Sequence, residues 1–218
     1  MKSANIQTPK IVIFDLDGVL VDACEWHRIA FNQALEKTAG YIISEKDHIE
    51  KYNGLPTATK LKILNDENII KPEDNILIHD LKQDLTIKLI EENIKTDQTK
   101  IELLKWLLSE GYKVACFTNS IMKTAHLMLE GAGIKEYFNV IVTNEDVESP
   151  KPNPEGYIKI MSKYNFSPTE CIIVEDSPKG IAAASASGAN VMKVKNATQV
   201  NRRSVGGFID ENFNTNGR

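Results

Sequence analysis

The chain has 218 residues and a net charge of −4 at pH 7, and 42% of its residues are hydrophobic and 26% charged. These proportions exclude extensive disorder, and no apolar run approaches the roughly 18 residues that a membrane-spanning helix needs. The charge is not gathered into a basic stripe with interleaved aromatic residues, so we do not expect nucleic acid as a partner. Because no secretion-signal pattern opens the sequence, we expect a cytoplasmic protein, either a monomer or a weak homodimer.

Five short apolar runs predict β-strands. In chain order they are "KIVIFDLD" from residue 10, "YKVACFTN" from 112, "NVIVTNED" from 139, "CIIVEDSP" from 171 and "NVMKVK" from 190. Most of them lack polar-apolar alternation, which is typical of strands buried on both faces of a parallel sheet. Helical stretches lie between the runs from residue 112 onward, so the sequence predicts an α/β fold built on a doubly wound parallel sheet with right-handed crossovers.

The segment from residue 22 to residue 97 carries helical periodicity and no strand-like run. We therefore expect a helical insertion that leaves the sheet after the first strand and acts as a lid. The predicted organisation is a core domain of residues 1–21 and 98–218 with an inserted all-helical cap domain of residues 22–97. After Lys195 the chain is rich in Asn and Gly, and we expect a loose tail in which only "GGFID" suits an edge strand.

Polar side chains follow three of the predicted strands directly. They are Asp15 and Asp17 after the first strand, Thr118 and Asn119 after the second, and Glu175 and Asp176 after the fourth. Ligands of an open parallel sheet bind at the carboxyl ends of its strands, so we expect these groups to converge. Four carboxylates at such short range cannot all be ionised unless a cation neutralises them. Since no His or Cys is among the donors, the pattern favours a hard ion and fits a catalytic Mg²⁺.

Lys151 lies between two prolines in "SPKPNPEGY", and these favour an extended backbone from which its ammonium group can reach the same edge of the sheet. A lysine, a Mg²⁺ ion, a threonine hydroxyl and backbone amides together form a cradle for a phosphoryl group. Phosphoryl transfer depends mostly on positioning and charge neutralisation, and a carboxylate can be the nucleophile. These residues therefore predict a phosphoryl-transfer site.

In these motifs the sequence resembles the haloacid dehalogenase-like (HAD) hydrolase superfamily, and within it the beta-phosphoglucomutase-like and phosphoglycolate phosphatase-like enzymes. "DLDGVLVD" looks like the first motif of the family, "FTNS" like the second, "KPNPEGY" like the third and "VEDSPKG" like the fourth. The match covers nearly the whole chain. It implies a Rossmann-like core with a helical cap inserted after the first motif.

The resemblance also implies a role for each motif residue. Asp15 would be the nucleophile, and Asp17 would be the general acid and base. The donors to Mg²⁺ would be Asp15, the backbone carbonyl of Asp17, Asp176 and, directly or through water, Glu175. The residues that hold the phosphoryl oxygens would be Thr118, Asn119 and Lys151.

Two cap residues, His27 and Lys82, stand at positions that assist proton transfer and lid closure in the mutases, and we include both among the candidate substrate-binding residues. Taken alone, His27 fits a structural role equally well, and a solvated helix face is the favoured interpretation of Lys82. Thr57 stands where the mutases carry an arginine for a second phosphate, and Ala23 stands where they carry a threonine at the hinge. Both differences favour a phosphatase over a mutase.

The sequence therefore predicts a Mg²⁺-dependent phosphatase that acts on a small phosphorylated metabolite, such as a sugar phosphate, through a phospho-aspartate. A phosphomutase is the first alternative. A dehalogenase is disfavoured because halide displacement needs no second acid at Asp17. A non-catalytic binder of a phosphorylated ligand on the same fold is the alternative from a different functional class.

Overall fold

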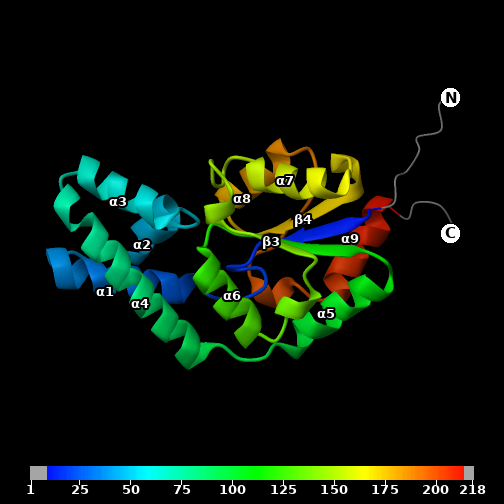
Figure 1. The fold of residues 1–218 in the computed structure, drawn as a ribbon, viewed down its shortest axis with the longest axis horizontal. Helices are drawn as coiled ribbons and strands as arrows, with labels where there is room; N and C mark the ends of the chain where they lie inside the picture. The colour runs from blue at the N-terminus through cyan, green and yellow to red at the C-terminus, as the bar shows by residue number, and fades with distance from the viewer. Residues whose placement is uncertain (1–8, 214–218) are drawn as a thin grey trace.

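The computed structural model describes residues 9–213, which form a sheet-based part and a helical part (Figure 1). The first strand and the helices that follow it are β1 (Ile11–Phe14), α1 (Cys24–Ala39), α2 (Glu45–Asp47), α3 (Thr57–Asp66) and α4 (Asn75–Asn93). The later elements are α5 (Gln98–Ser109), β2 (Lys113–Phe117), α6 (Met122–Gly131), β3 (Val140–Val142), α7 (Glu155–Tyr164), β4 (Cys171–Glu175), α8 (Pro178–Ala186), β5 (Asn190–Lys193) and α9 (Arg202–Phe213).

The strands form one parallel sheet in the order β3-β2-β1-β4-β5. Side chains of β1 alternate between its two faces. Ile11 and Ile13 pack with α7 and α8, and Val12 and Phe14 pack with α5, α6 and α9. Helices therefore cover both faces (Figure 1), which explains why the strands are apolar without alternation. The prediction of a doubly wound α/β fold is confirmed, and the strand order reverses between β1 and β4.

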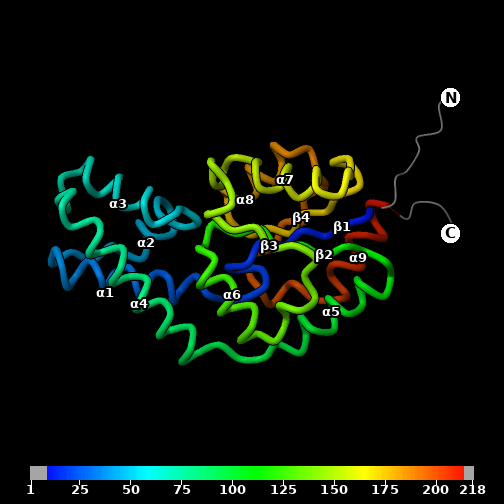
Figure 2. Tube along the Cα trace, in the orientation of Figure 1, coloured from blue at the N-terminus to red at the C-terminus, as the bar shows by residue number. Residues whose placement is uncertain are grey.

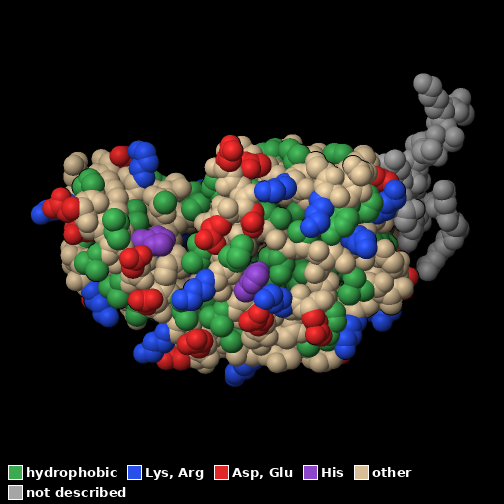
Figure 3. Space-filling view, in the orientation of Figure 1, with side chains coloured by type: hydrophobic (Ala, Val, Ile, Leu, Met, Phe, Trp, Pro, Cys, Tyr) green, Lys and Arg blue, Asp and Glu red, His purple; other side chains and the backbone are tan. Residues whose placement is uncertain are grey.

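Helices α1 to α4 pack beside the sheet-based part and have a hydrophobic cluster of their own, which includes Phe31, Leu35, Leu64 and Ile78. Figures 1 and 2 show this group at one end of the molecule, beyond the carboxyl ends of the strands. Their separation into a cap domain with boundaries at residues 22 and 97 stays a prediction. No helix in the described part of the chain is both long enough and apolar enough to cross a membrane. Basic and acidic side chains are intermixed over the face seen in Figure 3.

The C-terminal region differs from the prediction. The segment "GGFID" is not an edge strand but part of α9, and α9 packs on the core through Val205, Ile209 and Phe213. Each of these residues is four positions after the previous one, so all three lie on one face of the helix. Gly206 faces the ring of Trp106, where α9 approaches α5. The prediction of a loose tail is thus wrong as far as Phe213, and residues 214–218 lie outside the described residues.

Candidate active site

The loop after β1 brings Asp15 and Asp17 to the carboxyl edge of the sheet. The buried side chain of Leu16 anchors the turn between them. Gly18 has a φ of 83°, in the left-handed region that glycine adopts without a steric penalty. A Cβ atom at Gly18 would lie 2.3 Å from Oδ2 of Asp176. Glycine is therefore needed at this position both for the backbone conformation and for the close approach of the Asp176 carboxylate.

Lys151 joins the ends of three neighbouring strands. Its Nζ atom lies 2.7 Å from Oδ1 of Asp15, 2.6 Å from Oε1 of Glu175 and 2.8 Å from the carbonyl oxygen of Phe117. The side chain is only 4% exposed. The hydroxyl of Tyr157 donates a second hydrogen bond to the same Glu175 oxygen, at 2.6 Å. Residues that are far apart in the sequence therefore meet around one buried ammonium group.

The charges of this cluster are not balanced. Burial and the charge of Glu175 raise the pKa of Asp15, although Lys151 opposes this. Burial and the charge of Glu175 also raise the pKa of Asp176 to about 7. Burial works against the charged form of Lys151, yet Asp15 and Glu175 raise its pKa. One ammonium group thus faces three carboxyl groups, and a further positive charge would be favoured there.

The same carboxyl groups have a geometry that fits a metal ion. Oxygen atoms of Asp15, Glu175 and Asp176 lie within 4.8 Å of one another. Oδ1 of Asp176 is buried and has no hydrogen-bond partner among residues 9–213. The cluster offers carboxylate oxygen and neither thiol nor imidazole, the donor set of a hard cation such as Mg²⁺. Both oxygens of Glu175 already accept hydrogen bonds, which fixes the orientation of this carboxylate.

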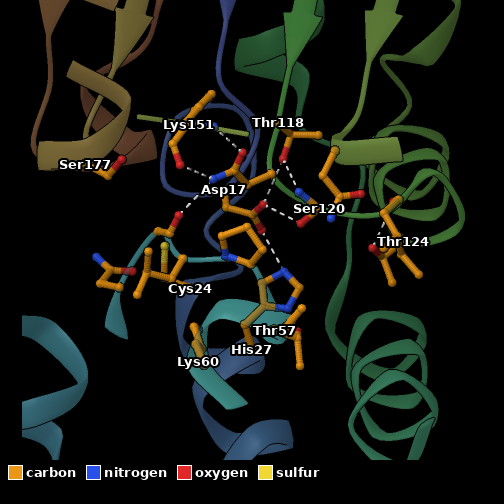
Figure 4. A pocket seen from close by; sticks show the side chains of 18 of the residues that line it. Asp17, Cys24, His27, Thr57, Lys60, Thr118, Ser120, Thr124, Lys151 and Ser177 are labelled. Carbon is orange, nitrogen blue, oxygen red and sulfur yellow. Dashed lines mark hydrogen bonds and ion pairs between the residues drawn. The ribbon is translucent and has the colours of Figure 1, made fainter. Parts of the chain in front are cut away.

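The side chain of Asp17 has different partners (Figure 4). Its Oδ1 atom lies 2.9 Å from Nε2 of His27. Its Oδ2 atom accepts hydrogen bonds from the hydroxyls of Ser120, at 2.9 Å, and Thr118, at 3.4 Å. Nζ of Lys82 lies 3.3 Å from Nδ1 of His27. A row of polar groups therefore runs from α4 through α1 to the loop after β1.

The protonation of this row follows from burial and from neighbouring charges. Burial opposes the ionised form of Asp17, yet His27 and Ser120 lower its pKa. Burial lowers the pKa of His27, and the charge of Lys82 acts in the same direction, although Asp17 opposes both. Neutral His27 can then accept at Nδ1 from Lys82 and donate at Nε2 to Asp17. Burial lowers the pKa of Lys82 to about 8, and because this side chain is buried, the interpretation of Lys82 as part of a solvated helix face is wrong.

Asn119 connects the two parts of the molecule rather than facing open space. Its Oδ1 atom accepts from the backbone N–H of Lys151 at 3.0 Å. Its Nδ2 atom donates to the carbonyl of Gly54, at 3.0 Å, in the loop before α3. The hydroxyl of Thr118 accepts the backbone N–H of Ser120. A phosphate-binding role for Thr118 and Asn119 stays a prediction.

Sequence reasoning missed two residues that the site contains. Ser120 directly follows the predicted pair Thr118 and Asn119, and the position next to a strand-end motif is a signal that could have identified it. Tyr157 ends the quoted motif "KPNPEGY", but it also lies on the apolar face of α7 among core residues, a position that favours a packing role. Only the tertiary structure brings its hydroxyl to Glu175.

A cavity of about 170 Å³ separates the two groups of side chains. The core side contributes acidic residues, hydroxyls and a lysine, chiefly Asp15, Asp17, Thr118, Ser120, Lys151 and Asp176. The helical side contributes Cys24, His27, Thr57, Lys60, His79 and Lys82. Figure 4 shows Lys151 and Thr118 on the sheet side of Asp17, with His27 and Lys60 on the opposite side. This arrangement can enclose a small molecule whose phosphoryl group lies at the acidic edge.

Comparisons with known proteins find relatives of similar sequence and a solved structure of similar fold. A curated relative, the phosphorylated carbohydrates phosphatase of Thermotoga maritima, is 30% identical over 180 residues, which is 81% of each chain. The pyrophosphatase PpaX of Halalkalibacterium halodurans is 32% identical over 182 residues, 81% of this chain and 79% of its own. The crystal structure of beta-phosphoglucomutase from Clostridium difficile has a TM-score of 0.79 at 24% identity and covers 93% of this chain and 98% of its own.

The family model of haloacid dehalogenase-like hydrolases matches residues 12–194. This range begins within β1 and runs through β5, and it includes the inserted helices. The chain belongs to the haloacid dehalogenase-like hydrolase family.

Proposed function

We propose that the protein is a Mg²⁺-dependent phosphatase that hydrolyses small phosphomonoesters through a phosphorylated Asp15. The family and the relatives make it a phosphatase or phosphomutase acting on phosphorylated substrates. The observation that carries the finer proposal is the meeting of Asp15, Glu175, Asp176 and Lys151 at one edge of a cavity, with a second aspartate, Asp17, held separately beside them. The cytoplasmic location and the oligomeric state stay predictions.

The proposed reaction has two steps. In the first, an oxygen atom of Asp15 attacks phosphorus, the bond from phosphorus to the leaving oxygen breaks, and Asp17 protonates that oxygen. In the second, water attacks the phosphorus of the aspartyl phosphate, Asp17 accepts the proton of the water, and inorganic phosphate leaves the Asp15 carboxylate. Lys151 holds Asp15 in place and neutralises charge on the phosphoryl oxygens.

The residues that would hold Mg²⁺ are Asp15 and Asp176, with Glu175 beside them. When bound, the ion would keep Asp15 ionised and neutralise charge on the phosphoryl group. Asp17 must instead be protonated before the first step, so its pKa has to rise when the substrate binds. Its hydrogen bonds lower its pKa before substrate binds, and the negative charge of an arriving phosphoryl group raises the pKa of a neighbouring carboxyl.

The helical part would act as a cap over the cavity. Three sets of contacts support this proposal: His27 with Asp17, Gly54 with Asn119, and the Lys179 ammonium with the carbonyl of Asn53 at 3.1 Å. A cap in this position excludes bulk water during transfer and strengthens electrostatic interactions inside the cavity.

The test is release of inorganic phosphate from a panel of phosphomonoesters with Mg²⁺ and with EDTA. We expect turnover with Mg²⁺ only, and a loss of at least about 1,000-fold in Asp15→Asn. Mass spectrometry of the rapidly quenched wild-type protein should detect one added phosphoryl group on the peptide that contains Asp15. Undiminished turnover by Asp15→Asn would reject the mechanism. Isomerised sugar phosphate without phosphate release would identify a mutase, and binding without turnover would identify a non-catalytic binder.

A further inference from the structure

Lys60 is a buried cation to which the proposed reaction gives no role. It lies in α3, its side chain lines the cavity, and the residue is only 7% exposed. Its ammonium group lies 5.6 Å from the centre of the Phe31 ring. Within residues 9–213 it makes no hydrogen bond or ion pair with an acceptor. An aromatic face attracts a cation, but it does not satisfy the N–H donors of an ammonium group that lines a cavity.

The other buried lysines of the described chain all have acceptors. Lys151 donates to two carboxylates, Lys82 lies 3.3 Å from the imidazole Nδ1 of His27, and Lys100 donates to the carbonyl of Ala197 at 2.8 Å. A buried charge without a partner is strongly disfavoured. Burial and the positive charge of Lys82 accordingly lower the pKa of Lys60 to about 7. Lys60 is therefore the exception, and a ligand could supply its missing acceptor.

The two ends of the cavity carry opposite charge. The acidic residues that line it, Asp15, Asp17 and Asp176, all belong to the core side. The residues that line it from the helical part include Lys60, Lys82 and two histidines and no acid. Figure 4 shows Lys60 across Asp17 from the strand ends. A ligand that spans the cavity would therefore meet positive charge at the end that is distant from Asp15.

We propose that Lys60 binds a second acidic group of the substrate, a carboxylate or a phosphate, while the phosphoryl group lies at Asp15. The inference rests on the proposed function and narrows its substrate class to short phosphomonoesters with a second negative charge. A cavity of about 170 Å³ is smaller than the roughly 300–1,000 Å³ typical of sites for drug-sized ligands. The spacer between the two acidic groups is therefore short. Thr57 lies one helical turn before Lys60 and also lines the cavity, so its hydroxyl can donate to the same group.

A matched set of substrates isolates this interaction. Ethylene glycol phosphate ends in a neutral alcohol, 2-phosphoglycolate has a carboxylate at that position, and ethylene glycol bisphosphate has a second phosphate. We expect the wild-type protein to prefer one or both acidic compounds in kcat/KM. Lys60→Met should lower kcat/KM for the preferred acidic compound by about 10- to 100-fold, the range for a hydrogen bond to a charged group. The same variant should leave kcat/KM for the alcohol within about twofold of the wild-type value. The acidic compound that the wild-type protein prefers shows whether the second acidic group is a carboxylate or a phosphate.

The matched control is Lys62→Met. Lys62 lies two positions further along α3, is 74% exposed and pairs with Asp66, so this variant should retain the wild-type preference. An acid preference that persists in Lys60→Met would overturn the proposal. An equal loss for all three compounds would also overturn it, because Lys60 would then act only on the structure of the site. Lys60→Met replaces an unpaired buried charge with an apolar side chain and should unfold at or above the wild-type temperature, and Lys60→Gln provides a second neutral variant.

A binding measurement separates this proposal from the proposed function. Titration calorimetry on Asp15→Asn protein, with and without Lys60→Met, measures affinity for the same three compounds without turnover. If the wild-type protein hydrolyses none of them, the proposed function fails for this substrate class, and a selective loss of affinity for the acids in the Lys60→Met background still supports the Lys60 site. Equal affinity of both backgrounds for the acids would reject the Lys60 site even if hydrolysis is observed.

Discussion

Substitution of Lys151 by methionine tests the central ion cluster most directly. The ammonium group of Lys151 donates at 2.6 to 2.8 Å to Glu175, Asp15 and the carbonyl of Phe117. Glu175 is fully buried, so water cannot replace the donor that its carboxylate loses. Removal of one partner of a buried ion pair costs about 3–5 kcal/mol. For a domain of this size each 1 kcal/mol lowers Tm by roughly 2–4 °C, so we expect Lys151→Met to unfold about 6 to 20 °C below wild type.

The pH dependence of this loss has a definite sign. The pKa of Asp15 is raised in the folded protein by burial and by Glu175, and removal of Lys151 raises it further. The folded state of the variant then binds a proton more tightly than the unfolded chain, in which the aspartate pKa is about 4. Stability of the variant therefore falls as pH rises from about 4 toward neutrality. We expect the difference from wild type to be largest near pH 7 and smallest below about pH 4.

The assay is urea denaturation followed by circular dichroism at several pH values in EDTA, with Lys10→Met as the control. Lys10 and Glu170 also form a lysine-glutamate pair at 2.6 Å, but the lysine side chain is 54% exposed. An exposed pair contributes little to stability, so Lys10→Met should denature close to wild type. If the two variants lose the same stability, or if the loss in Lys151→Met does not change with pH, burial of the pair is not what makes Lys151 important.

Four further predictions concern the metal-binding edge and Asp17. Mg²⁺ should stabilise the wild-type protein in calorimetry, by about 2.7 kcal/mol at 100 times its Kd. Asp176→Asn should lose this response and yet, in EDTA, be no less stable than wild type, because burial and Glu175 raise the pKa of Asp176 to about 7. His27→Leu removes the donor to Asp17 and should move the limb of the pH-rate profile that belongs to Asp17 to higher pH, since His27 lowers the pKa of Asp17. Gly18→Ala should lose about 1–3 kcal/mol in urea denaturation and should weaken Mg²⁺ binding, because φ is 83° and the new Cβ would overlap Asp176.

The fold and the acidic edge could be predicted because both depend on local pattern. A buried parallel strand is an uninterrupted apolar run, and the residues that follow such strands share one edge of the sheet. Asp15, Glu175 and Asp176 satisfy this rule and lie within 4.8 Å of one another. Lys151 is in a loop, and two signals indicated that it would reach the same edge: the prolines on either side of it and its position among the motifs of the family.

The helical residues could not be placed in this way. Lys82 has charged neighbours along α4, and its partner His27 is 55 residues away, so the sequence gives no indication that Lys82 is buried. The two glycines of "GGFID" weaken a helix and suggest a turn or an edge strand. In the structure, burial of Val205, Ile209 and Phe213 against the core outweighs that local preference. The apolar residue at every fourth position indicates a helix only if the two glycines are allowed inside it.

The division of the site between two parts of the chain has a consequence for Asp17. Asp15 interacts most closely with Lys151 and Glu175, which both belong to the core. Asp17 instead accepts hydrogen bonds from Ser120 of the core and from His27 of α1, and the charge of Lys82 on α4 lowers its pKa further. Any displacement of α1 and α4 removes two of the three groups that keep Asp17 ionised. The position of the helical part and the protonation of the second aspartate are therefore coupled, and the charge of Asp17 in turn raises the pKa of Asp15.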